Sequence, residues 1–157
     1  MRERQAVTDR RRAREFEAFV AGAAGRLLHV AALLTGEPRE TTPRAQRLLT
    51  AALARTYADW DRLRAGDPYD FTRQELALRF ARWAWLGRRR PSPGGLLAGL
   101  APQERVVLVL RLYEGVAEEQ TAALIGVPVE RVRAVCARAV TRVRDNTAAD
   151  RAGKPRP

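Results

Sequence analysis

Apolar residues recur every three to four positions in several stretches of the chain, which is the spacing of one face of an α-helix. The first stretch covers residues 10–35 and stops where Gly36 and Pro38 interrupt the pattern. Its apolar face holds Phe16, Phe19, Val20, Ala23 and Leu27. The second stretch covers residues 42–63, and its apolar side holds Leu48, Leu49, Ala52, Leu53 and Tyr57. These two patterns predict two amphipathic helices.

A third helix is predicted to begin at Thr72, because Glu75 follows three positions later with the spacing of a capping box. Residues 65–70 before it contain Gly66 and Pro68 and are expected to form a loop. The apolar stripe of this helix holds Leu76, Phe80 and Trp83.

The stretch RRRPSPGG, residues 88–95, is the strongest candidate for a domain boundary, because it combines two prolines with two glycines. We predict an N-terminal helical domain at 10–90, a linker at 91–99, a C-terminal helical domain at 100–146 and a disordered tail at 147–157. The sequence shows no alternation typical of strands. The expected fold class is therefore all-α, with two small helical domains joined by a short linker.

The segment EEQTAALIGVPVERVRAV, residues 118–135, breaks a helical pattern for only three residues. Gly126 can adopt the left-handed conformation that closes a helix, and Pro128 favours the entry of the next one. Two helices joined by so short a turn form a helix-turn-helix, whose second helix can enter a DNA major groove. The second helix is expected to end near Asp145, with a buried stripe of Val129, Val132, Cys136, Ala139 and Val143.

The opposite side of this second helix is rich in arginine, which can contact guanine with two hydrogen bonds or bind phosphate. Arg131 and Arg138 are seven positions apart and share a face, as do Arg133 and Arg144. The candidate DNA-binding residues of this helix are Arg131, Arg133, Arg138 and Arg142. A helical corner with a solvated arginine face remains the alternative.

The formal net charge of +11 changes the picture of possible partners. Such a charge favours a polyanion, either nucleic acid or an anionic membrane surface. Lys154 is the only lysine, and an arginine- and alanine-rich composition also arises in GC-rich genomes. Part of the positive charge is therefore discounted as evidence of function.

Catalytic and cofactor chemistry has few residues to use. The chain has one cysteine, Cys136, one histidine, His29, and one serine, Ser92. We therefore expect no disulfide, metal site, cofactor or hydrolytic triad, and we expect that the protein is not an enzyme. Charges interrupt every apolar run short of the ~18 residues of a membrane span. The arginines at 10–12 are followed by acids, not by the apolar core of a signal peptide, so the cytoplasm is expected.

Residues 100–144 resemble region 4 of a bacterial RNA polymerase sigma factor. The family pattern runs L-P-x-x-x-R-x-V-L-x-L-R-Y-Y-E, then E-x-x-T-A-x-x-L-G, then V-x-x-x-x-x-x-R-A. The matching positions are Leu100, Arg105, Val107, Leu108, Leu110, Arg111, Tyr113, Glu114, Glu118, Thr121, Ala122, Gly126, Val129, Val132, Arg138 and Ala139. The N-terminal part is similar to region 2, through LLTGEP at 33–38, Tyr57, Trp60, Phe80 and Trp83. Order and size resemble the small two-domain extracytoplasmic-function sigma factors of actinobacteria.

This resemblance implies partners and a division of labour. It implies promoter DNA and core RNA polymerase (its β′ and β subunits) as partners, and leaves room for an anti-sigma factor or another regulator. In such factors the N-terminal domain docks on the β′ coiled coil and melts the −10 element, and the C-terminal domain reads the −35 element. The residues that correspond to −35 reading are Arg131, Arg133 and Arg138, and those near the −10 strand are Arg82, Trp83, Arg88 and Arg89. Trp85 lies off the apolar stripe and is the freer candidate for stacking on an unpaired base.

The chain departs from the family pattern at the polymerase-docking helix. The family carries D-x-V-Q where this chain has Arg47, Leu48, Leu49 and Thr50, and the family's usual asparagine corresponds to Leu78. A reversed charge at a docking site is repulsive. Two interpretations follow: a divergent sigma factor with altered core contact at Arg47, Leu48 and Thr50, or a sigma-derived DNA-binding or protein-interaction regulator that does not drive initiation.

Overall fold

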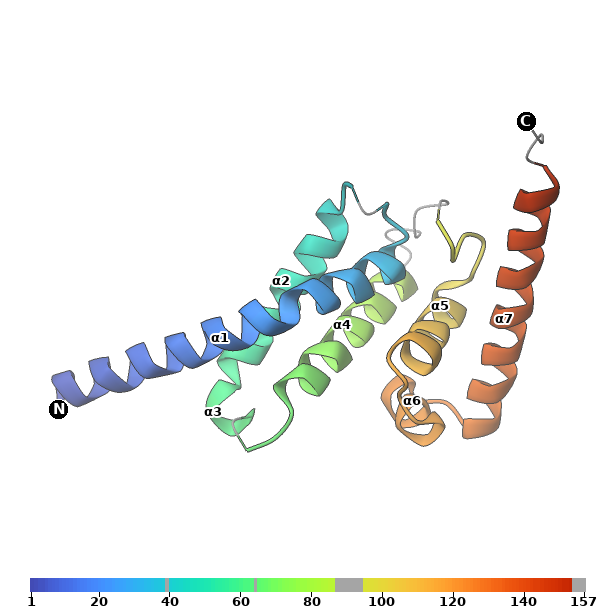
Figure 1. Cartoon of the computed structure of the whole chain (residues 1–157). Helices are drawn as coiled ribbons and strands as arrows, with labels where there is room; N and C mark the ends of the chain where they lie inside the picture. The colour runs from blue at the N-terminus through green and yellow to red at the C-terminus, as the bar shows by residue number, and fades with distance from the viewer. Residues whose placement is uncertain (39, 64, 87–94, 154–157) are drawn as a thin grey trace.

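The computed structural model describes residues 1–38, 40–63, 65–86 and 95–153. These residues form α-helices, one π-helical turn and connecting turns, with no strand among them (Figure 1), which confirms the all-α prediction. The N-terminal half contains the first four helices and the C-terminal half the rest. The elements are α1 (Arg2–Thr35), α2 (Pro43–Ala58), α3 (Trp60–Leu63), α4 (Pro68–Trp85), α5 (Pro102–Leu108), the π-turn η1 (Val109–Tyr113), α6 (Glu118–Ile125) and α7 (Val129–Ala152).

The turn after α1 shows why the sequence Gly36-Glu37 is needed there. Gly36 has a φ of 73°, and its N–H donates to the Ala32 carbonyl at 2.8 Å. The Glu37 carboxylate then accepts the backbone N–H groups of Arg44 at 2.9 Å and Ala45 at 2.7 Å. Those donors belong to the first turn of α2 and have no partner within the helix. Glu37 therefore caps α2, while the Thr42 side chain makes no capping bond.

Two expected helix boundaries in the N-terminal half are wrong. The helix expected at 42–63 is divided at Asp59, and the short α3 places Trp60 against Phe16 and Phe19, with ring centroids 5.2 and 5.4 Å away. The loop expected at 65–70 contains the start of α4. Asp67 accepts the N–H of Asp70 at 3.0 Å and Pro68 occupies the first turn, a combination that starts helices well.

Thr72 is not a helix cap but part of the core between α2 and α4. Its hydroxyl is buried and lies 2.8 Å from the buried hydroxyl of Thr56. Each hydroxyl also lies within hydrogen-bond distance of a carbonyl one turn back in its own helix, 3.0 Å from that of Ala52 and 2.7 Å from that of Pro68. One hydroxyl therefore donates to its carbonyl, and the other donates to the neighbouring hydroxyl. Glu75, the expected partner of the cap, instead pairs with Arg79 at 3.1 Å.

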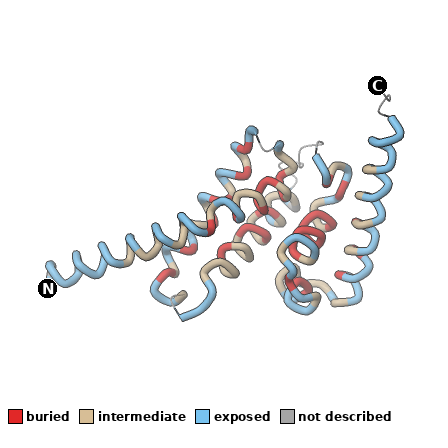
Figure 2. The backbone as a smooth tube through the Cα atoms, viewed as in Figure 1, coloured by how far each residue is buried: buried red, intermediate tan, exposed pale blue. Residues whose placement is uncertain are grey.

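The two long terminal helices extend beyond their expected limits. α1 begins at Arg2 and not at residue 10, and its exposed first turns project beyond the other helices (Figures 1 and 2). α7 continues to Ala152, past Asp145 and through much of the stretch expected to be a disordered tail. Of the expected linker at 91–99, residues 91–94 lie outside the described residues, and Leu97 is buried.

Helix α1 also contains an apolar stretch as long as a membrane span. By length and composition alone, part of Glu3–Thr35 is apolar enough to cross a membrane. Every 18-residue stretch of this helix contains a charged residue, Glu17 or Arg26 among them, so the expectation that charges interrupt each apolar run stands. In the folded chain α1 is a core helix that packs along α2 and α4, and its Arg26 pairs with Glu114 of the C-terminal half.

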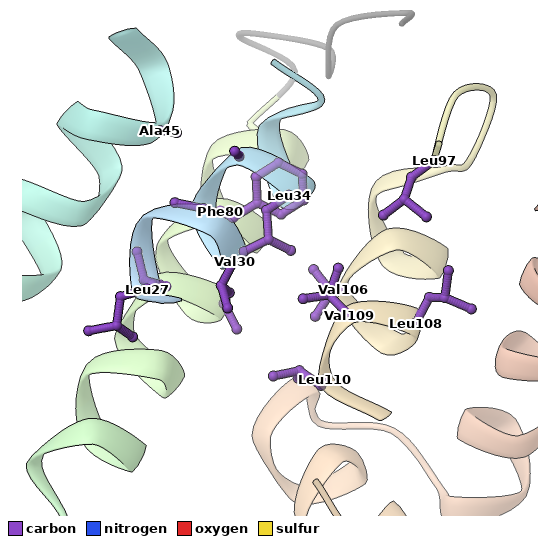
Figure 3. Close-up of a cluster of buried hydrophobic side chains, with 14 of the residues drawn as sticks. Leu27, Val30, Leu34, Ala45, Phe80, Leu97, Val106, Leu108, Val109 and Leu110 are labelled. Carbon is purple, nitrogen blue, oxygen red and sulfur yellow. The ribbon is translucent and has the colours of Figure 1, made fainter. Parts of the chain in front are cut away.

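The two halves share one hydrophobic core. Its buried residues come from α1, α2 and α4 on one side and from α5 and η1 on the other. Figure 3 shows Val30 and Leu34 of α1 pointing toward Val106 and Val109. Leu78 of α4 lines a small pocket of about 130 Å³ together with Leu124 and Ile125 of α6. The apolar side chain at residue 78 therefore lines a pocket that the two halves share.

Two buried polar groups of the C-terminal half bind the N-terminal half. The Arg105 side chain donates to the carbonyls of Leu33 at 3.0 Å and Leu97 at 2.8 Å. Leu33 lies in the last turn of α1, where carbonyls lack helical partners and attract cations. Burial lowers the pKa of Arg105 to about 10, so the guanidinium remains charged at neutral pH.

Glu114 is the second of these groups, and its side chain is fully buried. It accepts hydrogen bonds from the Tyr69 hydroxyl at 3.0 Å, Arg26 Nε at 3.1 Å and an Arg73 nitrogen at 3.3 Å. The N–H of Glu114 closes the π-turn by donating to the Val109 carbonyl at 3.0 Å. The wider turn therefore sets the direction in which Glu114 leaves the helix.

Candidate nucleic-acid interface

The turn between α6 and α7 has the geometry of a helix-turn-helix. Gly126 has a φ of 71°, in the left-handed region that favours glycine. The N–H groups of Gly126 and Val127 both donate to the Ala122 carbonyl, at 2.9 and 3.1 Å. Pro128 is the N-cap residue of α7, which begins at Val129. The predicted three-residue break at 126–128 is confirmed.

Helix α7 is held by one apolar side, which packs against α5 and α6. Val132, Val135 and Ala139 are buried, and the first two share a small core with Val107 and Ala122. Sequence reasoning missed Val135, which lies beside Cys136 on the same side of the helix. Figure 1 places α7 on the outer side of α5 and α6, away from α1 and α2. The remaining sides of α7 therefore face solvent.

The predicted arginines of α7 are all exposed. They are Arg131, Arg133, Arg138 and Arg142, and Arg144 accompanies them. Two are held by acids that the sequence did not indicate. Arg133 Nε lies 2.6 Å from Glu118 of α6, and Arg142 lies 3.1 Å from Glu104 of α5. Arg131 and Arg138 make no ion pair with any residue that the structure describes.

The ion pair with Glu118 stabilises the positive charge of Arg133. The hydrogen bond and charge of Glu118 raise the pKa of Arg133 above its ordinary value. Guanidinium groups remain protonated at any physiological pH. Charge-assisted pairing with Glu118 and Glu104 fixes the positions of Arg133 and Arg142, and leaves Arg131 and Arg138 available for an added anion.

The predicted sites of the N-terminal half lie on α2 and α4. Arg82 is exposed near the end of α4, Trp85 is the last residue of that helix, and Arg88 and Arg89 lie outside the described residues. On α2, Arg47 and Thr50 are exposed and Leu48 is half-buried. Arg47, Leu48 and Arg82 line one groove between the two helices, so the structure brings together residues that were assigned separately to polymerase and DNA.

Sequence reasoning missed the polar cluster around Glu114. Its members are Arg26, Tyr69, Arg73 and Glu114, and they come from α1, α4 and the end of η1. Burial, followed by the charge of Glu114, raises the pKa of Tyr69 well above its ordinary range. The partners are 41 to 88 positions apart in the chain, so no local pattern could have paired them.

A short glycine turn followed by an exposed basic helix is the arrangement of helix-turn-helix DNA-binding proteins. Residues 96–145 match the family "Sigma-70, region 4". The chain is 30% identical to the RNA polymerase sigma-E factor of Streptomyces coelicolor, over 86% of this chain and 87% of that protein. It is 31% identical to the sigma-E factor of Streptomyces avermitilis, over 83% of this chain and 84% of that protein. The chain therefore belongs to the extracytoplasmic-function RNA polymerase sigma factors, and its role is in transcription initiation.

Proposed function

We propose that this protein is a promoter-specificity subunit that binds core RNA polymerase through its N-terminal half and reads the −35 element with α7. The observation that carries the proposal is the exposed arginine face of α7 behind the Gly126 turn. Phosphate contacts would position α7 in the major groove, and base contacts would select the sequence. In the N-terminal half, Arg82 with Trp85, Arg88 and Arg89 would handle the −10 strand.

Binding of both elements at once requires the two halves to separate. The −10 and −35 positions are about 25 base pairs apart, which is roughly 85 Å of duplex. A compact chain of this length has a radius of gyration of only about 15 Å. We infer that promoter and core binding replace the contacts of Glu114 and Arg105 across the two halves.

The DNA-binding part is tested by fluorescence anisotropy on a duplex that carries a selected −35 sequence. Arg131→Ala and Arg138→Ala are expected to weaken binding by about 1–3 kcal/mol each if they contact bases. Arg133→Ala is a less direct test, because it also releases Glu118. A phosphate-only role would weaken binding equally on all sequences and reduce the salt slope by about one per arginine. Arg14→Ala on α1 is the matched control, and unchanged affinity in both α7 variants would mean that α7 is not the reading helix.

A second candidate function is a sigma-derived regulator that does not itself drive initiation. It is favoured by Arg47 and Thr50, which are exposed on α2 where the family carries an acid and an amide. Like charges at a docking site disfavour the encounter, so we expect core binding weaker than that of an ordinary factor of this type. Docking through other α2–α3 positions such as Asp59 and Asp61 is the alternative.

Pull-down of core polymerase separates these possibilities. The double variant Arg47→Asp with Thr50→Gln should bind core more tightly than the wild type. Equal and tight binding by both proteins would show that docking is not impaired. Absence of binding by both would favour the regulator.

A further inference from the structure

The ion pair between Glu118 and Arg133 joins the two helices of the helix-turn-helix. Glu118 is the first residue of α6, and its Oε2 lies 2.6 Å from Nε of Arg133 on α7. Its Oε1 lies 3.7 Å from a terminal nitrogen of Arg111 on η1, and Arg111 also donates to the Val116 carbonyl. The Arg133 side chain is 57% exposed, against 25% for Arg111. The Glu118 carboxylate is therefore anchored from the inner side of the domain, and Arg133 is its outer partner.

The hydrogen bond to Glu118 uses only one donor of the Arg133 side chain. A guanidinium has five N–H donors, one on Nε and four on the two terminal nitrogens. Glu118 accepts the Nε donor, and the terminal nitrogens of Arg133 make no hydrogen bond to a residue that the structure describes. Two parallel donors of this kind can contact O6 and N7 of a guanine. Arg133 therefore keeps an edge that can read a base while its other edge is held.

The place of Glu118 in the domain is unfavourable for general DNA affinity. The first turn of a helix has unpaired N–H groups and a partial positive charge, which attract phosphate. In a helix-turn-helix the first helix crosses the DNA backbone, and an acid in its first turn repels phosphate there. Glu119 lies in the same turn and is exposed, but it makes no ion pair with a described residue. Glu119 thus shares the charge of Glu118 without its contact to Arg133.

We propose that Glu118 is a positioning residue that sets how strictly α7 discriminates between bases, because it holds Arg133 in the orientation that contacts a guanine. This inference rests on the proposed function, since it requires α7 to read DNA. Ordering a long side chain on binding lowers affinity, and a side chain that is already held avoids most of that loss. A held guanidinium also cannot turn toward whichever phosphate lies nearest. Glu118 therefore lowers the general attraction to DNA and raises the discrimination between sequences.

The other arginines of α7 provide the contrast. Arg131 and Arg138 are exposed and pair with no acid that the structure describes, so their side chains can follow phosphates over a range of positions. Arg142 pairs with Glu104 at 3.1 Å, but it lies in the second half of α7. The residues near the start of a recognition helix are those that contact base edges. Among these four arginines, Arg133 combines a place near the start of α7 with an acidic partner.

The test compares Glu118→Ala with the matched control Glu119→Ala in the full-length chain. Fluorescence anisotropy measures binding to a duplex with the −35 sequence selected by the wild type, to its single-base-pair variants and to a duplex of unrelated sequence. Each variant removes one acid from the same turn. Both should therefore bind the unrelated duplex about twofold more tightly at low salt, a gain that added salt screens. In Glu118→Ala alone, the preference for one guanine should fall about threefold to tenfold, the range expected for ordering one long side chain.

Two further variants identify the cause of the loss. Arg133→Ala should abolish the preference at the same base pair, and Glu118→Ala added to it should change discrimination no further, because the two residues act as one unit. Glu118→Gln keeps an oxygen that accepts from Nε but has no charge. It should bind the unrelated duplex as Glu118→Ala does and keep more of the base preference. A purely structural role of Glu118 would instead weaken binding to every duplex alike.

Two results would overturn this inference alone, provided that Arg131→Ala and Arg138→Ala weaken binding. One is equal discrimination in Glu118→Ala and Glu119→Ala. The other is a loss in Glu118→Ala at a base pair different from the one lost in Arg133→Ala. A wild type without base preference, or arginine variants that bind like the wild type, would overturn the proposed function as well. Circular dichroism checks folding, and if Glu118→Ala loses helix, Glu118→Gln compared with Glu119→Gln decides.

Discussion

Replacement of Glu114 is expected to be the most damaging single change to the packing between the two halves. Its fully buried carboxylate is the shared acceptor for Arg26, Tyr69 and Arg73. Removal of one member of a buried ion pair costs about 3–5 kcal/mol, because the remaining charge is left without a partner. For Glu114 the loss of folding free energy should lie near the lower end of this range. The Arg26 side chain is 56% exposed and can turn to water, and Arg73 keeps its pair with Asp70.

We therefore expect Glu114→Ala to lower the free energy of unfolding by about 3 kcal/mol. Glu114→Gln keeps an acceptor oxygen but loses the charge, and should cost about 1–2 kcal/mol. The assay is urea denaturation of the full chain followed by circular dichroism. Glu17→Ala on an exposed part of α1 is the control, and should change stability by less than about 0.5 kcal/mol.

The outcome that would refute this reasoning is a loss in Glu114→Ala no larger than in the control. A second readout concerns the arrangement of the two halves. The distance between labels on α2 and α7 should increase in Glu114→Ala, because the polar link across the halves is lost. An unchanged distance together with an unchanged stability would mean that the buried cluster does not hold the halves together.

Three further predictions concern stability. Gly126→Ala should lower the free energy of unfolding by about 1 kcal/mol, measured by thermal denaturation, because a residue with a Cβ is strained at a φ of 71° even where the surrounding space is open. An unchanged melting temperature would contradict the left-handed turn. Because the pKa of Tyr69 is raised in the fold, the folded chain holds one more proton than the unfolded chain above about pH 10, and stability should fall there. Tyr69→Phe should lose that part of the alkaline dependence, and a spectroscopic titration in which all three tyrosines ionise together near pH 10 would contradict the shift. Thr56→Val or Thr72→Val should each lower the free energy of unfolding by about 0.5–1.5 kcal/mol, because the hydrogen bond between the hydroxyls is lost while the remaining hydroxyl keeps its backbone carbonyl. The double variant should cost less than the sum, and strict additivity would mean that the two hydroxyls do not interact.

Features determined by short-range chemistry could be predicted from the sequence. The break at Gly126 and Pro128 depends on the left-handed preference of glycine and the fixed φ of proline, and both act within a few residues. The exposed arginines of α7 followed from helical periodicity in the same way. The start of α4 could also have been predicted, because Asp67 followed by Pro68 is a helix-start signal. The prediction was wrong because Gly66 and Pro68 were interpreted as loop residues.

Features that depend on the approach of distant segments could not be predicted. The buried contacts of Glu114 and Arg105 join positions up to 88 residues apart, and a lone acid or arginine in a helix is usually solvated. The pairing of Arg133 with Glu118 depends on how α6 and α7 cross. The groove between α2 and α4 arises because Arg47 and Arg82, on separate helices, both line it.

Run-off transcription tests the central claim most directly. Purified core RNA polymerase is combined with the full chain on promoter-containing fragments of its own genome. The account predicts discrete transcripts that core alone does not make, and their loss in the Arg131→Ala/Arg138→Ala variant. Transcripts identical to those of core alone, in the presence of chain that is folded and binds DNA, would contradict a role as a promoter-specificity subunit.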